Sequence, residues 1–277
     1  MKQRQGKVAV ITGGASGIGR AVAEAAASAG MKLVLADIEE GPLKEADAAL
    51  GAAGAEVLSV VTDVSVGSSV ENLRDKALER FGGVHLVHNN AGVAVGGPIW
   101  TVSEADWTWV LGVNLWGVIH GVRAFVPVLL EQGEGHVVNT ASLAGLTSPA
   151  MLGPYNVTKH SVVTLSETLH RDLELVGSSV GVSVLCPGFV RTGIAESERN
   201  RPDWAPPVPA APGPDLQGIV RGLVAAGIDP ADVAGKVLDA VRTNRFYIIT
   251  HDDTPAMVEI RMRDILDGAN PSAAPIA

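Results

Sequence analysis

Short apolar runs alternate with longer amphipathic segments along most of the chain. The runs are rich in β-branched residues and apolar at consecutive positions, which is typical of parallel strands covered by helices on both faces. They predict strands at residues 8–12, 32–36, 56–62, 86–89, 136–140, 180–185 and 246–250. The segments between them predict helices at residues 19–29, 42–50, 70–81, 104–130, 154–176 and 230–243. This alternation indicates an α/β fold, a doubly wound Rossmann-type parallel sheet of seven strands in a single domain over residues 1–277.

Two segments depart from this alternation. Residues 193–218 contain six prolines, and an irregular insertion of this length is usually either a lid over a binding site or a disordered segment. We predict a substrate lid there, with Trp204 as its apolar contact. The tail at 270–277 is made of small residues and proline, and it is predicted to fray.

Composition excludes several classes of protein. Apolar residues make up 47% and charged residues 18% of the chain, as in globular proteins with a large core, and the formal charge of −9 argues against a general affinity for nucleic acid or anionic membranes. Cys186 is the only cysteine, so there is no disulfide framework, and a buried inert thiol is expected. No unbroken apolar run reaches about 18 residues, so we expect no transmembrane helix and a cytoplasmic protein.

Two further kinds of chemistry lack support in the sequence. The closest pair of histidines, His85 and His88, has an odd spacing that places the two rings on opposite faces of a strand, so no metal site is expected. A serine hydrolase is also disfavoured, because no Gly-x-Ser-x-Gly elbow follows a strand.

A glycine-rich turn follows the first predicted strand and opens directly into a helix. Its pattern is Gly13-x-x-x-Gly17-x-Gly19, in which glycines permit a tight turn and let the backbone approach a phosphate at the helix N-terminus. Asp37 follows 18 residues later at the end of the second strand, where a carboxylate can accept both hydroxyls of an adenosine ribose. An ordinary strand-to-helix turn is the alternative, but strand, helix and acid in this order favour a dinucleotide site.

Two weaker signals lie at the ends of the next strands. Asp63 and Val64 would line an adenine pocket, although an Asx turn explains this aspartate almost as well. Small and amide residues follow the fourth strand in the order Asn89-Asn90-Ala91-Gly92, at the sheet edge where a nucleotide would lie, but alone they indicate only a turn.

Tyr155 and Lys159 are four residues apart in a predicted helix, so their side chains project from one face. A phenol has a pKa of ~10, and bringing it to about 7 requires ~4 kcal/mol. An ammonium at about 4 Å supplies an energy on the order of 4 kcal/mol at an effective dielectric constant near 20. Lys159 could therefore make Tyr155 a proton-transfer group, but most such pairs are a solvated lysine beside a packed ring.

Together these motifs resemble the classical branch of the short-chain dehydrogenase/reductase family, over about residues 7–192 and the strand at 246–250. The glycine turn and the Asn-Asn-Ala-Gly run match its first two signatures, and Pro187-Gly188 with Thr192 matches its nicotinamide-side loop. The positions of its catalytic tetrad hold the residues that the family requires, namely Asn114, Ser142, Tyr155 and Lys159.

The resemblance implies a role for each member of the tetrad. Tyr155 would exchange a proton with the substrate oxygen, and Lys159 would lower its pKa and bind the nicotinamide ribose. Ser142 would hydrogen-bond the substrate oxygen. Asn114 would hold a water, which requires a kink in its helix. The cofactor-binding residues that it implies are Gly13, Ser16, Gly17, Ile18, Gly19, Asp37, Asp63, Val64, Asn90, Ala91, Gly92, Tyr155, Lys159, Pro187, Gly188, Val190 and Thr192.

The substrate is less well determined. By family position, the pocket residues are nearly all apolar, namely Val93, Ala94, Val95, Leu143, Met151, Leu152, Phe189 and Ile194. This favours a small, uncharged alcohol or ketone, although Arg191, Arg199 and Arg201 leave room for an acid. A larger ring alcohol, such as a steroid, terpenoid or polyketide, is the second choice within the family.

The sequence favours NAD over NADP, because Asp37 would repel the additional phosphate of NADP. NADP-preferring relatives usually carry a cation where this chain has Ser16 and Ile38, and we expect Arg20 to face away from the ribose. The predicted function is therefore an NAD-dependent oxidoreductase acting on a secondary alcohol or ketone.

Two hypotheses come from other classes. A non-catalytic NAD-binding regulator would not need the intact tetrad, and an interaction scaffold would have no NAD affinity. The resemblance also implies a homotetramer, assembled through long helices whose apolar residues include Trp109, Trp116, Val163 and Leu169.

Overall fold

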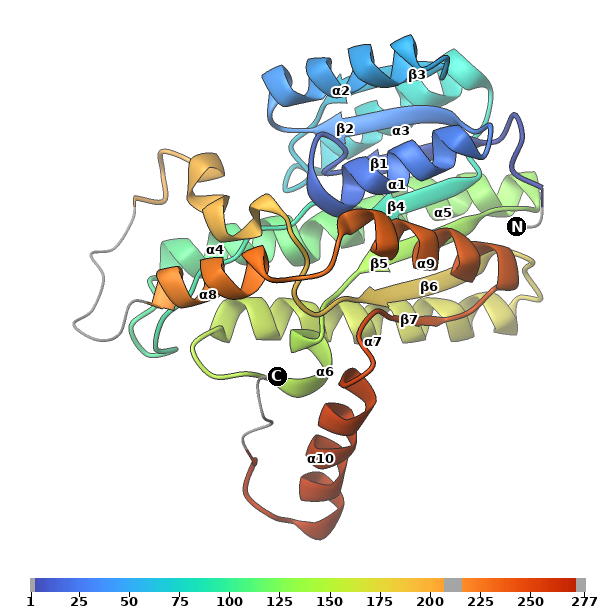
Figure 1. Cartoon of the computed structure of the whole chain (residues 1–277). Helices are drawn as coiled ribbons and strands as arrows, with labels where there is room; N and C mark the ends of the chain where they lie inside the picture. Colours follow the sequence, from blue (N-terminus) through green and yellow to red (C-terminus); the bar gives the residue numbers. More distant parts are fainter. Residues whose placement is uncertain (1–2, 207–215, 273–277) are drawn as a thin grey trace.

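The computed structural model describes residues 3–206 and 216–272. Seven parallel strands form one sheet in the order β3-β2-β1-β4-β5-β6-β7, which confirms the predicted Rossmann-type fold (Figure 1). The strands are β1 (Val8–Thr12), β2 (Lys32–Asp37), β3 (Val57–Val61), β4 (Leu86–Asn89), β5 (His136–Thr140), β6 (Gly181–Cys186) and β7 (Tyr247–Ile249). Residues 207–215 of the predicted lid and 273–277 of the predicted frayed tail lie outside the described residues.

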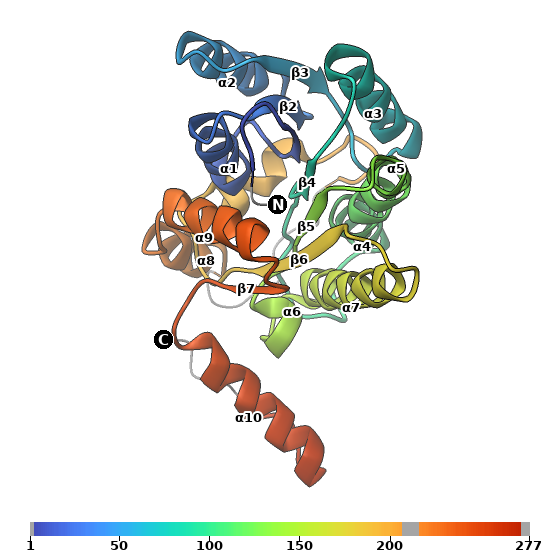
Figure 2. The same cartoon turned by 90° about the vertical axis from the view of Figure 1, so that its right-hand side faces the viewer.

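Helices cover both faces of the sheet (Figure 2). One face carries α1 (Gly17–Ser28), α2 (Glu40–Ala52) and α9 (Pro230–Thr243). The other carries α3 (Gly67–Phe81), α5 (Gly117–Gln132) and α7 (Gly153–Leu175). Consecutive side chains of β1 point to opposite faces of the sheet. Ile11 packs in the hydrophobic core beneath α1, α2 and α9, whereas Val10 packs in the core beneath α3, α5 and α7. This explains why β1 is apolar at four consecutive positions, Val8 to Ile11.

Four helices were not predicted from the sequence. They are α6 (Ala144–Thr147), the 3-10 helix η2 (Gly193–Asn200), α8 (Leu216–Ala225) and α10 (Thr254–Asp267). The described parts of the predicted lid are thus helical at both ends, on either side of the prolines. Helix α10 projects away from the sheet (Figure 2), and Thr254 is its one fully buried residue within the described chain.

The helix predicted at 104–130 consists of three parts. They are α4 (Glu104–Leu111), a π-helical turn η1 (Gly112–Trp116) and α5. By length and composition, the whole stretch Glu104–Gln132 could cross a membrane, a possibility that the search for unbroken apolar runs overlooked. This is weak evidence, because α5 packs on β4, β5 and α3 as a core helix does, and such helices pass the same test.

The sheet reverses its strand order between β1 and β4, where parallel sheets of this type form their binding crevice. A buried chain of amides crosses the core close to this point. Asn89 Nδ2 donates to Asn139 Oδ1 at 2.9 Å, and Asn139 Nδ2 donates to Ser166 Oγ at 3.0 Å. These hydrogen bonds link β4, β5 and α7. Helix α5 lies directly against them, as shown by Gly121, where an added Cβ would lie 2.0 Å from Asn89 Oδ1.

We predict that Gly121→Ala lowers the free energy of unfolding by about 1–3 kcal/mol, because a methyl group there forces α5 away from β4. Gly235→Ala in α9 is the matched control, since a Cβ there meets nothing within 4 Å and should add about 0.5–1 kcal/mol. Thermal and denaturant unfolding would measure both changes. Equal stability of the two variants would contradict the close packing at Gly121.

Candidate active site

The kink expected at Asn114 is present as the π-helical turn η1, a feature that is frequent at functional sites. The Asn114 side chain is fully buried and binds the loop after β4. Its Oδ1 accepts from Val93 N at 2.8 Å, and its Nδ2 donates to Val93 O at 2.9 Å and to Thr158 Oγ1 at 3.3 Å. Because both amide atoms bond to protein groups, the side chain fixes this loop.

Tyr155 lies in the first turn of α7, and Lys159 lies one turn later on the same face, as the spacing predicted. The Lys159 Nζ donates to the Thr140 carbonyl at 2.9 Å and lies 5.4 Å from the centre of the Tyr155 ring. The lysine side chain is 3% exposed. Burial lowers the pKa of Lys159 to about 8, since a charged ammonium loses its water there.

Ser142 lies just beyond the end of β5 and reaches both Tyr155 and the loop after β6. Its Oγ accepts from Ala144 N at 3.1 Å and donates to Pro187 O at 3.5 Å. Burial raises the pKa of Tyr155, and a hydrogen bond with Ser142 opposes that rise. In the protein alone, the pKa of Tyr155 is thus raised and not lowered, because the desolvation of the phenolate dominates. The effect of Lys159 on this pKa stays a prediction.

The glycine-rich turn has the geometry that a phosphate cradle needs. Gly13 and Gly17 adopt φ angles of 64° and 53°, in the left-handed region that favours glycine. A Cβ on Gly19 would lie 2.1 Å from the Gly13 carbonyl oxygen, so α1 packs against the turn without room for a side chain. Asn90 Nδ2 supports the turn from β4 by donating to the carbonyls of Thr12 and Gly13 at 3.0 and 3.4 Å. The turn thus leads into the free amide groups of a helix N-terminus.

Asp37 and Asp63 occupy different local environments. The Asp37 carboxylate accepts from Ala15 N and from Glu39 N, each at 3.1 Å, and burial raises its pKa while these backbone bonds oppose the rise. Asp63 Oδ1 accepts from Ser65 N at 2.9 Å and from Ser65 Oγ at 2.6 Å, which is the geometry of an Asx turn. Asp63 therefore has a structural role in addition to its place near the predicted adenine pocket.

One cavity of about 2000 Å³ contains nearly all of the predicted site. Its wall includes the glycine turn, Asp37, Ser142, Tyr155 and Lys159. It also includes the eight predicted pocket residues, from Val93 to Ile194. All the remaining predicted cofactor residues line it as well, with the exception of Gly19. Gly19 and the catalytic candidate Asn114 are buried and do not line the cavity. Trp204 reaches the cavity from the lid but is 58% exposed.

Several apolar residues of the cavity were not predicted. They come from α4, α8 and α10, and include Trp109, Ile219, Val220, Leu223, Met257 and Ile260. The only signal for α8 was apolar residues at one-turn spacing just after the proline-rich stretch, where no motif marks a site.

The start of the lid is held down by ion pairs. Arg201 bonds Asp106 at 2.6 Å, with both side chains less than 10% exposed, and its guanidinium lies 4.7 Å from the centre of the Trp109 ring. Arg199 bonds Glu39 at 2.6 Å. These contacts tie η2 and the residues after it to α4 on one side and to the end of β2 on the other.

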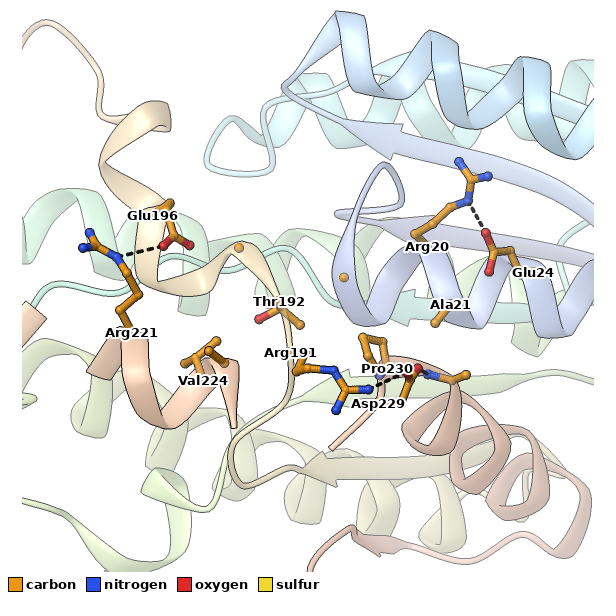
Figure 3. Close-up of a pocket in the computed structure, with 14 residues that line it drawn as sticks. Arg20, Ala21, Glu24, Arg191, Thr192, Glu196, Arg221, Val224, Asp229 and Pro230 are labelled. Carbon is orange, nitrogen blue, oxygen red and sulfur yellow. Dashed lines mark hydrogen bonds and ion pairs between the residues drawn. The ribbon is translucent and has the colours of Figure 1, made fainter. Parts of the chain in front are cut away.

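A smaller pocket of about 660 Å³ lies beside α1, and each arginine in it faces an acid (Figure 3). Arg191 bonds Asp229 at 2.7 Å, and Arg20 bonds Glu24 at 2.7 Å. Arg20 therefore lines this pocket and not the large cavity, in agreement with the expectation that it faces away from the ribose. Arg191, Arg199 and Arg201 are each paired with a carboxylate.

A model of the short chain dehydrogenase family matches residues 7–203 of the chain. A short-chain dehydrogenase/reductase from Burkholderia phymatum, solved in complex with NAD, is 51% identical, with all of both chains covered and a TM-score of 0.95. A CLA biosynthesis dehydrogenase/reductase of Lactiplantibacillus plantarum is 35% identical, with 97% of this chain and 96% of the relative covered. A 1-deoxy-11-beta-hydroxypentalenate dehydrogenase of Streptomyces arenae is 37% identical, with coverages of 95% and 87%.

We predict that the stability gained by Lys159→Met depends on pH. The lysine pKa is about 8 in the folded protein and about 10.5 in the unfolded chain, so folding releases protons in this window and the wild type gains stability as pH rises through it. The advantage of the methionine variant should therefore shrink by about 3 kcal/mol between pH 7 and pH 10.5.

Denaturant unfolding at both pH values would measure this difference. Lys236→Met, on the exposed surface of α9, is the matched control and should show no such change. A difference that is independent of pH would show that Lys159 is not desolvated.

Proposed function

We propose, because the chain belongs to the classical short-chain dehydrogenase/reductase family, that it is an NAD-dependent oxidoreductase that interconverts a secondary alcohol and a ketone. The observation that carries this proposal is the single cavity that holds Tyr155, Ser142 and Lys159 together with the glycine turn and Asp37. A proton-transfer group and a dinucleotide cradle in one cavity are what hydride transfer to a carbonyl requires.

The residues present fit a nicotinamide dinucleotide. The turn at Gly13 and the N-terminus of α1 would hold the pyrophosphate, and Asp37 would accept the hydroxyls of the adenosine ribose. Lys159 would bind the nicotinamide ribose, and residues 187–192 would lie along the nicotinamide. When bound, the cofactor supplies or accepts the hydride at C4. The NAD complex of the Burkholderia phymatum protein supports this choice.

The chain's own residues provide the proton and the positioning. Ser142 would donate a hydrogen bond to the substrate oxygen, where negative charge develops. Tyr155 would give its phenol proton to that oxygen during reduction and take a proton from the alcohol during oxidation. Because burial raises the pKa of Tyr155, the phenol is protonated at neutral pH and ready for reduction, whereas oxidation should become faster as pH rises.

The substrate is proposed to be uncharged and apolar. The pairing of Arg191, Arg199 and Arg201 with carboxylates supports this choice over the acidic alternative that the sequence left open for these three residues. A small alcohol or ketone fits this cavity, and so does a bulkier ring alcohol, which the apolar side chains of α8 favour. A relative named for a hydroxypentalenate supports the bulkier class. Turnover of a panel of secondary alcohols with NAD would separate these substrates, and turnover of any would exclude a non-catalytic regulator.

We also propose a cytoplasmic homotetramer. Trp116 is 51% exposed and could enter an interface, whereas Trp109 and Val163 are buried within the protomer. Fewer of the apolar residues named from the sequence are therefore available for contact with a second subunit than the sequence suggested. A monomeric mass by light scattering at micromolar concentration would contradict the assembly.

We predict that Tyr155→Phe lowers turnover by at least about 100-fold, because it removes the general acid/base. The ring keeps its packing, so the affinity for NAD should stay close to that of the wild type. Steady-state kinetics and a separate NAD titration would measure the two effects. Turnover like that of the wild type would remove Tyr155 from the mechanism.

We predict that the unaltered protein prefers NAD over NADP by at least tenfold in kcat/KM, if the charged hydrogen bonds of Asp37 contribute ~1.5–3 kcal/mol. Combining Asp37→Ala with Ile38→Arg should erase or invert this preference, because a cation then replaces the repelling carboxylate. Kinetics with both cofactors would test the prediction. Equal efficiency of the unaltered protein with NAD and NADP would show that Asp37 is misplaced.

A further inference from the structure

The ion pair between Arg199 and Glu39 joins residues 160 positions apart across the large cavity, which both line. Arg199 comes from η2, and Glu39 lies between β2 and α2. The guanidinium presents one edge to the carboxylate, since Nε donates to Oε1 at 2.6 Å and Nη2 lies 3.5 Å from Oε2. This is the edge with which an arginine binds a phosphate in the bidentate manner.

The other corner of the same guanidinium is fixed by the backbone of its own helix. Arg199 Nη1 donates to the carbonyls of Gly193 and Glu196 at 2.8 and 3.0 Å. A Cβ on Gly193 would lie 3.3 Å from Nη1, so the glycine makes room for this arrangement. The orientation of the Arg199 edge therefore does not depend on Glu39 alone.

Glu39 lies close to the residue that is proposed to bind the adenosine ribose. Its backbone amide donates to Asp37 Oδ1 at 3.1 Å. Burial and, to a smaller extent, the negative charge of Glu39 raise the pKa of Asp37, so the two carboxylates act on each other. The ribose end of the cavity thus carries two carboxylates and one guanidinium, and one carboxylate occupies the guanidinium edge.

We propose that Glu39 is a second determinant of cofactor choice, because it occupies the edge of Arg199 that would otherwise bind the ribose phosphate of NADP. The inference rests on the proposed dinucleotide site and adds a residue that the sequence motifs did not indicate. Neutralising Glu39 changes the formal charge of this group from −1 to zero and leaves an anchored guanidinium with a free edge beside the ribose.

The test is the direct binding of NAD and NADP to the intact protein by calorimetry, without turnover. Glu39→Gln should strengthen NADP binding by at least about tenfold, the effect of one charge-assisted contact, and change NAD binding by less than about threefold. Glu39→Gln combined with Arg199→Met should lose the gain, because the phosphate partner is removed. Arg199→Met alone should weaken NADP binding more than NAD binding, because it changes the formal charge of this group from −1 to −2 and leaves the Glu39 carboxylate unpaired.

Arg221→Met is the matched control. Arg221 bonds Glu196 at 3.2 Å on the side of η2 that faces the smaller pocket (Figure 3). The variant removes an ion pair to the same helix but leaves Asp37, Glu39 and Arg199 unchanged, so the affinities for NAD and NADP should both stay as in the unaltered protein. An equal gain in NADP binding in Arg221→Met would trace the effect to a looser η2 and overturn the proposal.

Two further results would also overturn it. A loss of NAD and NADP affinity by the same factor in Arg199→Met would place this arginine on a part common to both cofactors. An unchanged NADP affinity in Glu39→Gln, with NAD still bound, would refute the role of Glu39 and leave the proposed function intact. If the unaltered protein bound neither dinucleotide, the proposed function and this inference would fail together.

Discussion

The arrangement of the site depends on Thr140, the last residue of β5, which joins its cofactor side to its catalytic side. The Thr140 Oγ1 donates to Asn90 Oδ1 at 3.2 Å, and Asn90 in turn holds the glycine turn after β1. The Thr140 carbonyl accepts from Lys159 Nζ at 2.9 Å, which orients the lysine beside Tyr155. A single strand end therefore sets the distance between the phosphate cradle and the proton-transfer group, and a shift of β5 would move both.

The carboxyl edge of the sheet is where such coupling is possible. Parallel strands all end on the same side, so residues from the ends of β1, β4 and β5 meet although they are far apart in the sequence. Local geometry then adapts to these contacts. The π-helical turn η1 reorients Asn114 toward Val93, and the left-handed Gly13 lets the chain turn directly beneath Asn90. Both of these backbone irregularities lie where the strand ends converge.

The sequence predicted the features that have local signals. The seven strands follow from β-branched apolar runs, and the cradle follows from glycines at fixed spacing. The contacts that hold the lid could not be predicted in this way, because Arg201 and Asp106 are 95 positions apart and no motif relates them. The sign of the Tyr155 pKa shift failed for another reason. Spacing predicts on which face of the helix Lys159 lies but not how deeply the phenol is buried, and burial is the largest cause of the raised pKa of Tyr155.

Burial has the same consequence for both proton-carrying groups of the site. It raises the pKa of Tyr155 and lowers that of Lys159, so burial shifts each group toward its neutral form. Because both groups are buried, a phenolate forming beside a charged lysine is stabilised more than it would be in water, since less solvent screens the pair. The buried pair of Arg201 and Asp106, beside Trp109, fixes the residues just after η2 on α4 and so forms part of the wall of the large cavity.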